Sequence, residues 1–467
     1  MTLPHPLNPM TRHLLIPALA LSGAAGLCAA DPAGTVSSFA AAGPPASSAL
    51  AEPATLRASS SRIEAELRQD ILPFWMQHVP DRAHGGFVGE ISNDLVVRKD
   101  APRGGLLTAR ILWTFSAAYQ RYHDPAYLEM ARWARDDLVG RFWDERDGGL
   151  YWTVTPDGAP LDTRKEIYLQ AFGILGLSEY YRATGDPAAL QQATTLYHAI
   201  ETHARDHTHG GYFEEFSREW KLQTDVGVHR SLMGSQALKS QNVHLHILEA
   251  YTNLLRVWPD ASFRQTLREL AEVMLTRVYD SRSHHLRLFL DPDWTPRSQS
   301  ISYGHDIEFS WLACEAANEL HDPDLIARSK AMAVEVVRTT LAEGVDADGG
   351  IFNEGGPAGL TDRSKDWWPQ AEAMVGFLNA YQLGGDPEFL RASLHTWDFI
   401  EARLVDRENG EWFRGVTKDG RHSSDPKVSL WKCPYHNGRA CMEMVNRINA
   451  VLTRSRPAAE AAAAPRN

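Results

Sequence analysis

Histidines, carboxylates and amides recur at helical spacings in this chain, and together they could transfer protons and bind hydroxyl groups. His305 and Glu308 are three residues apart and Asn242 and His246 are four apart, so each pair can share one face of a helix. A neighbouring carboxylate favours the protonated imidazole and fixes its orientation, whereas a helix N-terminus favours the neutral form. Histidines with different neighbours can therefore hold different protonation states near neutral pH, which suits general acid–base catalysis.

The residues capable of this chemistry fall at the same place in six successive sequence units. The first helix of each unit is predicted to begin near Leu106, Ile167, Asn242, Gly304, Trp368 and Pro434. Close to these starts lie Arg110, Tyr168, Asn242 with His246, His305 with Glu308, Trp368 with Glu372, and Trp431 with His436. If the units close into a ring, these positions converge on one axis and line a single pocket. We take His305, His436 and His246 as candidate catalytic residues, and the other seven as candidate substrate-binding residues.

The candidate binding residues suit an uncharged sugar. Trp368 and Trp431 offer flat apolar faces for pyranose rings, although tryptophans of the core would give the same pattern. Arg110, Tyr168 and Asn242 can form hydrogen bonds with hydroxyl groups.

Other residues of the same types are predicted to be structural, and other catalytic classes lack their signatures. His244 lies off the face of His246, and Glu249 and Glu443 are expected to be support residues or ion-pair partners. The sequence has neither a recognised zinc spacing, nor a Gly-rich phosphate loop, nor a Gly-x-Ser-x-Gly elbow. Cys433 and Cys441 are eight residues apart on one predicted helix, roughly 12 Å at 1.5 Å per residue, which is too far for a disulfide. We therefore expect no metal site.

Two recurring turns divide the chain into these units. A Gly-Gly pair followed by an apolar residue occurs at Gly85-Gly86, Gly148-Gly149, Gly210-Gly211 and Gly349-Gly350, and is degenerate at Gly410-Glu411. The copy expected near His284-His285 lacks its glycines. An aspartate beside a proline recurs at Asp124, Asp186, Asp260, Asp322 and Asp386, as expected at helix starts. Each unit is therefore predicted to be a helix, an Asp-Pro turn, a second helix and a Gly-rich hairpin.

The units predict an all-α fold, an (α/α)6 barrel of six helix hairpins with short β-hairpins or loops at one end. A helix pair cannot bury its apolar face alone, so pairs of about 66 residues must stack side by side over residues 61–452. An open superhelix is the alternative. Closure is favoured because single helices predicted at 61–78 and 434–452 could complete the ring.

The two ends of the chain are predicted to lie outside this domain. Residues 1–30 resemble a secretory signal peptide, with an apolar stretch from Leu14 to Leu27 before Cys28-Ala29-Ala30, so we expect export to the periplasm or beyond the cell. Residues 31–60 are rich in Ala, Ser and Pro and are predicted to be a disordered linker. Residues 453–467 are predicted to be a disordered tail.

The composition excludes several kinds of partner. The formal net charge of −12 disfavours nucleic acid as a ligand, and no apolar run reaches the 18–20 or so residues of a membrane span. The oligomeric state is not readable from the sequence, and a monomer that binds a small-molecule disaccharide is the working expectation.

Four motifs carry a resemblance to a known family. Asn242-Val-His-Leu-His246, Tyr303-Gly-His305-Asp-Ile-Glu308, Trp367-Trp368-Pro-Gln-Ala-Glu372 and Trp431-Lys-Cys-Pro-Tyr-His436 resemble, in order and spacing, segments of the N-acylglucosamine 2-epimerase superfamily. Within it, they are most similar to the cellobiose 2-epimerases. The resemblance covers residues 61–450.

The resemblance implies an (α/α)6 barrel that inverts carbon 2 of the reducing-end sugar in β-1,4-linked disaccharides, without a metal or nucleotide cofactor. By motif, His305 and His436 match an acid/base pair, and His246 matches a histidine that assists ring opening. Glu308, Asn242, Arg110, Tyr168, Trp368 and Trp431 match pocket residues. Proton removal from carbon 2 would give a cis-enediol, and Arg110 could stabilise the charge on its oxygen.

Several alternatives stay open. A proton returned to carbon 1 would make the enzyme an aldose–ketose isomerase, and the substrate could be a monosaccharide or N-acylglucosamine. Another class with this barrel, the inverting glycoside hydrolases, needs two carboxylates about 6.5–9.5 Å apart, for which Glu308 and Glu372 are the candidates. A sugar-binding protein without catalysis is a third class. Residues 214–239, which include Trp220, His229 and Arg230, are either a lid over the pocket or a surface insertion.

Overall fold

Five helices begin at an aspartate, as the Asp-Pro pattern predicts. In this computed structural model, which describes residues 52–224 and 237–462, each of these aspartates accepts a hydrogen bond from the backbone N–H two residues further on. The side chain thereby satisfies a donor that the first turn leaves unpaired. The helices are α5 (Pro125–Asp137), α7 (Pro187–His203), α10 (Ala261–Val273), α12 (Pro323–Glu343) and α14 (Pro387–Arg403).

A second set of helices forms an inner ring, and these helices are buried on nearly all sides except near some of their C-terminal ends. These helices are α4 (Gly105–Tyr122), α6 (Ile167–Thr184), α9 (Gln241–Leu255), α11 (Tyr303–Leu320), α13 (Trp367–Gly384) and α15 (Tyr435–Ala462). Each begins within one residue of the start predicted from the repeats. Helices apolar all round belong inside a protein, whereas the one-sided helices that begin at aspartates face solvent and form the outer ring.

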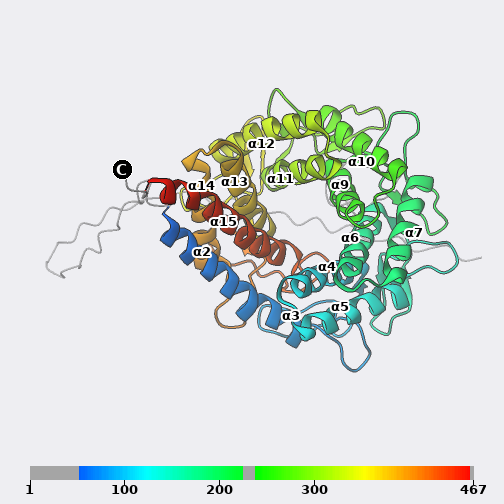
Figure 1. Cartoon of the computed structure of the whole chain (residues 1–467). Helices are drawn as coiled ribbons and strands as arrows, with labels where there is room; N and C mark the ends of the chain where they lie inside the picture. The colour runs from blue at the N-terminus through cyan, green and yellow to red at the C-terminus, as the bar shows by residue number, and fades with distance from the viewer. Residues whose placement is uncertain (1–51, 225–236, 463–467) are drawn as a thin grey trace, which may run out of the picture. The chain divides into compact units, whose positions relative to one another are not determined.

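The inner ring is closed. Contacts run from α4 to α6, α9, α11, α13 and α15 in turn, and α15 also contacts α4 (Figure 1). The outer helices surround this ring, and the first of them is the N-terminal helix, which packs on α15. The predicted (α/α)6 barrel is therefore confirmed, and the open superhelix is wrong.

The N-terminal helix starts earlier than predicted. Helix α2 (Pro53–Glu66) continues through a π-helical turn, Leu67–Ile71, into α3 (Leu72–His78). Residues 53–60, predicted to belong to a disordered linker, are thus helical, because Leu56 and Ile63 on one side of α2 are buried. Composition alone could not reveal those two anchors. The predicted signal peptide and the linker up to residue 51 lie outside the described residues.

The C-terminal helix also runs further than predicted, because α15 ends at Ala462 rather than near residue 452. The Ala-rich segment after residue 456 looked like a tail, yet Ala has the highest helix propensity of all residues. The tail prediction is therefore wrong for residues 453–462.

Two-residue strand pairs hold the N-terminal ends of the inner helices. The strand just before an inner helix pairs, antiparallel, with a strand that follows the next outer helix: β1 (Arg103–Gly104) with β2 (Thr153–Val154), β4 (Lys165–Glu166) with β5 (Glu215–Phe216), β6 (Lys239–Ser240) with β9 (Phe289–Leu290), β10 (Ile301–Ser302) with β11 (Glu354–Gly356), and β13 (Lys365–Asp366) with β14 (Gly415–Val416). Hairpins add β3 (Pro160–Asp162), β7 (Tyr279–Asp280), β8 (His285–Leu286) and β12 (Gly359–Asp362). These pairs fix one mouth of the barrel.

The fourth residue of an inner helix fastens the Gly-rich turn beside it. Gln170, His244 and Gln370 each accept the backbone N–H of the residue after a turn, at 2.7–2.9 Å. His244 is therefore structural, as predicted. In α11 this place is taken by Asp306, whose carboxylate also contacts His285 at 2.8 Å, in the turn that lacks glycines.

Among the described helices, none combines the length and the apolarity that crossing a bilayer requires.

Candidate active site

A cavity of about 150 Å³ lies among the N-terminal ends of the inner helices. Nine of the ten predicted site residues line it: Arg110, Tyr168, Asn242, His246, His305, Glu308, Trp368, Trp431 and His436. All six units contribute, as the repeat register predicts. The tenth residue, Glu372, lies behind His436. A larger cleft of about 1010 Å³ beside β8 and β12 contains none of these residues.

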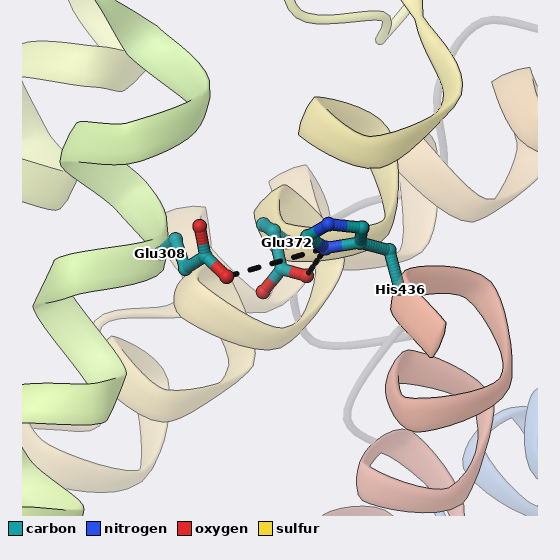
Figure 2. Close-up of side chains that lie close together, drawn as sticks. All are labelled: Glu308, Glu372 and His436. Atoms are coloured by element: carbon teal, nitrogen blue, oxygen red, sulfur yellow. Dashed lines mark hydrogen bonds and ion pairs between the residues drawn. The ribbon is translucent and has the colours of Figure 1, made fainter. Parts of the chain in front are cut away.

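His436 is oriented by a buried carboxylate. Its Nδ1 lies 2.7 Å from Oε1 of Glu372 and 4.0 Å from Oε1 of Glu308 (Figure 2). An ionised carboxylate only accepts, so with Glu372 ionised Nδ1 carries the proton and the lone pair is on the ring nitrogen turned away from Glu372. Burial, together with the cations of Arg110 and Arg439, holds the pKa of His436 well below its ordinary value. The imidazole is therefore neutral and can accept a proton.

His246 has the same arrangement with a different carboxylate. Its Nδ1 lies 3.1 Å from Oε2 of Glu249, and burial lowers the pKa of the imidazole. Burial of Glu249 favours its neutral form, but the Arg439 cation and the His246 hydrogen bond outweigh this and lower its pKa to about 2. Glu249 thus has the supporting position that the sequence predicts.

His305 approaches the cavity from α11, whereas His436 approaches it from α15. Nδ1 of His305 lies 2.7 Å from the Ser302 hydroxyl. The Trp368 ring contacts both imidazoles, with centroid separations of 4.6 Å to His305 and 5.7 Å to His436. Two imidazoles from different elements, with different neighbours, therefore border one small space.

Arg110 is held as a fixed cation at the cavity wall. Its Nη2 donates to the Tyr168 hydroxyl at 2.6 Å and its Nη1 to the backbone carbonyl of Trp431 at 3.2 Å. The guanidinium lies 4.2 Å from the centroid of the Phe172 ring. A cation in this position can stabilise negative charge that develops in the cavity.

Four buried polar atoms of cavity-lining residues have no hydrogen-bond partner within the described part of the protein. They are Nε of Arg110, Oδ1 of Asn242, Oε2 of Glu308 and Nε1 of Trp367. Burial and the nearby Glu372 raise the pKa of Glu308 well above its ordinary value. Buried polar atoms are nearly always paired, so this set indicates a polar ligand that supplies both donors and acceptors.

The main residue that sequence reasoning missed is Arg439. It contacts Glu249, Glu308 and Glu372, which lie on three different helices. Its position three residues after His436 on the same helix was the available signal, but nothing in the sequence showed that carboxylates surround it. Trp367 and Arg414 also line the cavity and were not predicted.

Glu308, Glu372 and His436 bring ligand-type atoms within 4.8 Å of one another. Nη2 of Arg439 already lies 2.7 Å from Oε1 of Glu308 and 2.8 Å from Oε1 of Glu372. A metal ion at this place would have to displace the guanidinium.

The segment predicted as a lid or a surface insertion is described only at its two ends. Trp220 stacks on His203 with a centroid separation of 4.6 Å and donates to the Asp147 carbonyl at 2.8 Å, so it packs between the end of α7 and the Gly148-Gly149 turn. His229 and Arg230 lie outside the described residues.

The chain is similar in sequence and fold to proteins of one family. A family model described as N-acylglucosamine 2-epimerase (GlcNAc 2-epimerase) matches residues 85–440. A cellobiose 2-epimerase of Bacteroides fragilis is 43% identical over 385 residues, which cover 82% of this chain and 97% of that protein. Another, of Dictyoglomus turgidum, is 39% identical over 394 residues, which cover 84% and 100%. The solved structure of cellobiose 2-epimerase from Bacillus thermoamylovorans matches with a TM-score of 0.81 at 39% identity, covering 84% of this chain and 100% of that one. This chain belongs to the N-acylglucosamine 2-epimerase family.

Proposed function

We propose that this protein is a carbohydrate epimerase that inverts carbon 2 of the reducing-end sugar in β-1,4-linked disaccharides. The proposal is supported by relatives named cellobiose 2-epimerase that are 43% and 39% identical over most of the chain. The observation that carries it is that His305 and His436, from different helices, line the same small cavity. Inversion needs access for protons to both faces of one carbon, and two imidazoles on different helices are suited to supply it.

The reaction follows from this arrangement. The sugar ring opens, assisted by His246, and the aldehyde makes the hydrogen on carbon 2 acidic. One imidazole takes that proton, and the electron pair of the broken C–H bond forms the carbon 1–carbon 2 double bond of a cis-enediolate. Arg110 stabilises the negative oxygen. The other imidazole, in its protonated form, returns a proton to the opposite face, and the direction of reaction decides which histidine acts first.

A second cavity supports a disaccharide rather than a single sugar. It has a volume of about 200 Å³ and shares Asn242, His305 and Trp368 with the first cavity. Asn353 and Asp366 add polar groups to its wall. The second ring of a substrate would extend into this space.

The geometry does not favour the inverting hydrolase. The carboxylate oxygens of Glu308 and Glu372 approach within 4.8 Å, whereas such enzymes need about 6.5–9.5 Å between their carboxyl groups. Glu372 is also occupied, because Trp311, Arg439 and His436 all donate to it.

Incubation in heavy water with cellobiose, mannobiose, lactose and mannose tests the proposal. Deuterium at carbon 2 of the reducing-end sugar, with an epimeric product, is the expected result. Release of glucose from cellobiose would identify a hydrolase, a ketose product an isomerase, and binding without turnover a binding protein.

Separate His305→Asn and His436→Asn variants test the two proton carriers. Each is expected to lower kcat by about 10²–10⁴-fold, the usual contribution of general acid–base catalysis, while keeping affinity for the sugar. His198→Asn, at an exposed position on α7, is the control and should retain wild-type turnover. Full activity in either of the first two variants would remove that histidine from the mechanism.

We also propose that residues 1–30 direct export and that the enzyme is a monomer. N-terminal sequencing of the secreted protein, together with light scattering in solution, tests both. An intact Met1 or a larger mass would contradict them.

A further inference from the structure

Arg439 lies at the centre of the charged groups beneath the cavity. It follows His436 by one turn of α15, and only 3% of its surface is exposed. Its Nη2 donates to Oε1 of Glu308 at 2.7 Å and to Oε1 of Glu372 at 2.8 Å, and its Nη1 donates to Oε1 of Glu249. One guanidinium therefore joins carboxylates from α9, α11 and α13, none of which is on its own helix.

Two of these carboxylates are the ones that orient histidines. Glu249 accepts from Nδ1 of His246, and Glu372 accepts from Nδ1 of His436. Arg439 itself is not among the residues that line the cavity. Arg439 therefore acts on the reaction without touching the sugar, through its three carboxyl partners and through its charge.

The guanidinium is also fixed in place. It lies 4.4 Å from the centroid of the Tyr435 ring and 4.8 Å from that of Trp311. A planar cation between aromatic rings, with both terminal nitrogens donating to carboxylates, has little freedom to move.

The charges explain why a cation is needed there. Burial favours the neutral form of a carboxyl group, and three buried carboxylates also repel one another. Burial raises the pKa of Glu372 above its ordinary value even with Arg439 present, and the Arg439 cation is the strongest influence in the opposite direction. A protonated Glu372 would carry its own O–H donor, and the Nδ1–H of His436 would lose its acceptor.

We propose that Arg439 is a positioning residue: its charge keeps Glu249 and Glu372 as carboxylates, so that His246 and His436 both hold their proton on Nδ1 and present Nε2 to the sugar. This role rests on the proposed function, because it matters for turnover only if these histidines carry protons. Arg439 thereby sets the tautomer of two imidazoles that come from opposite sides of the ring of helices.

The tautomers can be measured without any reaction. In protein labelled with ¹⁵N-histidine, the ring nitrogen shifts of His246 and His436 distinguish Nδ1–H from Nε2–H, and variants lacking each histidine assign the signals. The wild-type protein at neutral pH is expected to show Nδ1–H at both positions. The Nε2–H form in the wild type would overturn the proposal, whatever any Arg439 variant does.

Arg439→Met removes the charge and keeps an unbranched side chain. We expect both tautomers to become mixed and kcat to fall at least about tenfold, with KM changing much less. The acidic limb of the kcat/KM profile should move to higher pH, since a cluster that has lost a buried cation takes up a proton more readily. Arg439→Lys keeps the charge and should bring the acidic limb back towards that of the wild type.

Arg447→Met is the matched control. Arg447 lies two turns further along α15, contacts Glu443 at 2.9 Å, and also lies over the Trp311 ring. The Arg447→Met variant should leave the acidic limb of the kcat/KM profile and the tautomers of His246 and His436 unchanged. If Arg439→Met lowers only stability, and keeps the wild-type tautomers and limb, then Arg439 merely ties helices together and the proposal is wrong. If the wild type turns over none of the sugars tested, the proposed function fails, and the tautomers still decide the role of Arg439.

Discussion

The histidines of the cavity differ in what holds their Nδ1 atoms. His246 and His436 each donate to a carboxylate, whereas Nδ1 of His305 lies beside the Ser302 hydroxyl. A carboxylate only accepts and so fixes the tautomer, while a hydroxyl can donate or accept and allows either one. His305 can therefore change between proton donor and acceptor without a change of partner, as a reversible epimerisation requires.

Glu308 gives a prediction at this scale. Burial and Glu372 raise its pKa well above the ordinary value, which favours the neutral side chain, and glutamine matches that form in charge and shape. Glu308→Gln should keep kcat/KM within about tenfold of the wild type, whereas Glu308→Ala, which removes one of the three partners of Arg439, should lose about a hundredfold. Equal losses in steady-state assays of the two variants would show that Glu308 acts as an anion.

The contact that the fourth residue of an inner helix makes with the neighbouring turn differs between units, and in one unit it can titrate. In α6 and α13 the fourth residue is a glutamine that fastens the Gly-rich turn. In α11 the fourth residue is Asp306, one residue after His305. The His285 ring lies between Asp306 and Glu343, the last residue of α12, and Nε2 of His285 is 3.2 Å from Oε2 of Glu343. In α11 the contact made by the fourth residue is therefore an ion pair, whereas in α6 and α13 it is an amide hydrogen bond.

This ion pair predicts a pH dependence of stability. Burial lowers the pKa of His285, but Asp306 and Glu343 outweigh it and raise the pKa above its ordinary value. Because the folded protein binds this proton more tightly than the unfolded chain, the contribution is fully present below about pH 6.5 and is lost as pH rises through the raised pKa. The Tm of the His285→Gln variant should lie furthest below that of the wild type at pH 6, and the two Tm values should converge at alkaline pH. A difference that grows with pH would contradict this.

At the scale of the whole molecule, contacts between distant parts of the chain close the ring. The indole N–H of Trp75 in α3 donates to Glu411 at 2.6 Å, and that of Trp412 donates to Glu66 in α2 at 2.9 Å. Each of these hydrogen bonds links residues more than 330 positions apart in the sequence. The first helices are thus joined to the last Gly-rich turn.

Trp412→Phe should lower the free energy of unfolding by about 1–3 kcal/mol beyond its loss of packing, because Glu66 would lose a buried donor. Trp397→Phe is a matched control, since Trp397 is equally buried, its ring centroid lies 6.5 Å from that of Trp412, and its indole N–H has no partner among the described residues. The free energies of unfolding of the two variants are measured with denaturant, and the difference between their losses gives the contribution of the Trp412–Glu66 hydrogen bond. Equal losses would show that this bond contributes nothing to closure.

Repeat register was enough to predict the ring and most of its site. Six helix starts and nine cavity residues follow from the spacing of turns and from the rule that equivalent positions converge. The start of α2 was missed because two buried residues decide it within a segment of linker composition. Arg439 was missed because its role depends on distances between four helices, which no spacing along one helix contains.

The cavity takes at least one side chain from every unit of the ring, which bears on the time at which activity appears. During synthesis, a nascent chain whose residues before Tyr435 have left the ribosome still lacks His436 and Arg439 in its folded part. In the proposed mechanism, proton transfer can start only once the last helix has packed between its two neighbours. Turnover of sugar is therefore a direct assay of completed folding, and every incompletely assembled intermediate is silent in it.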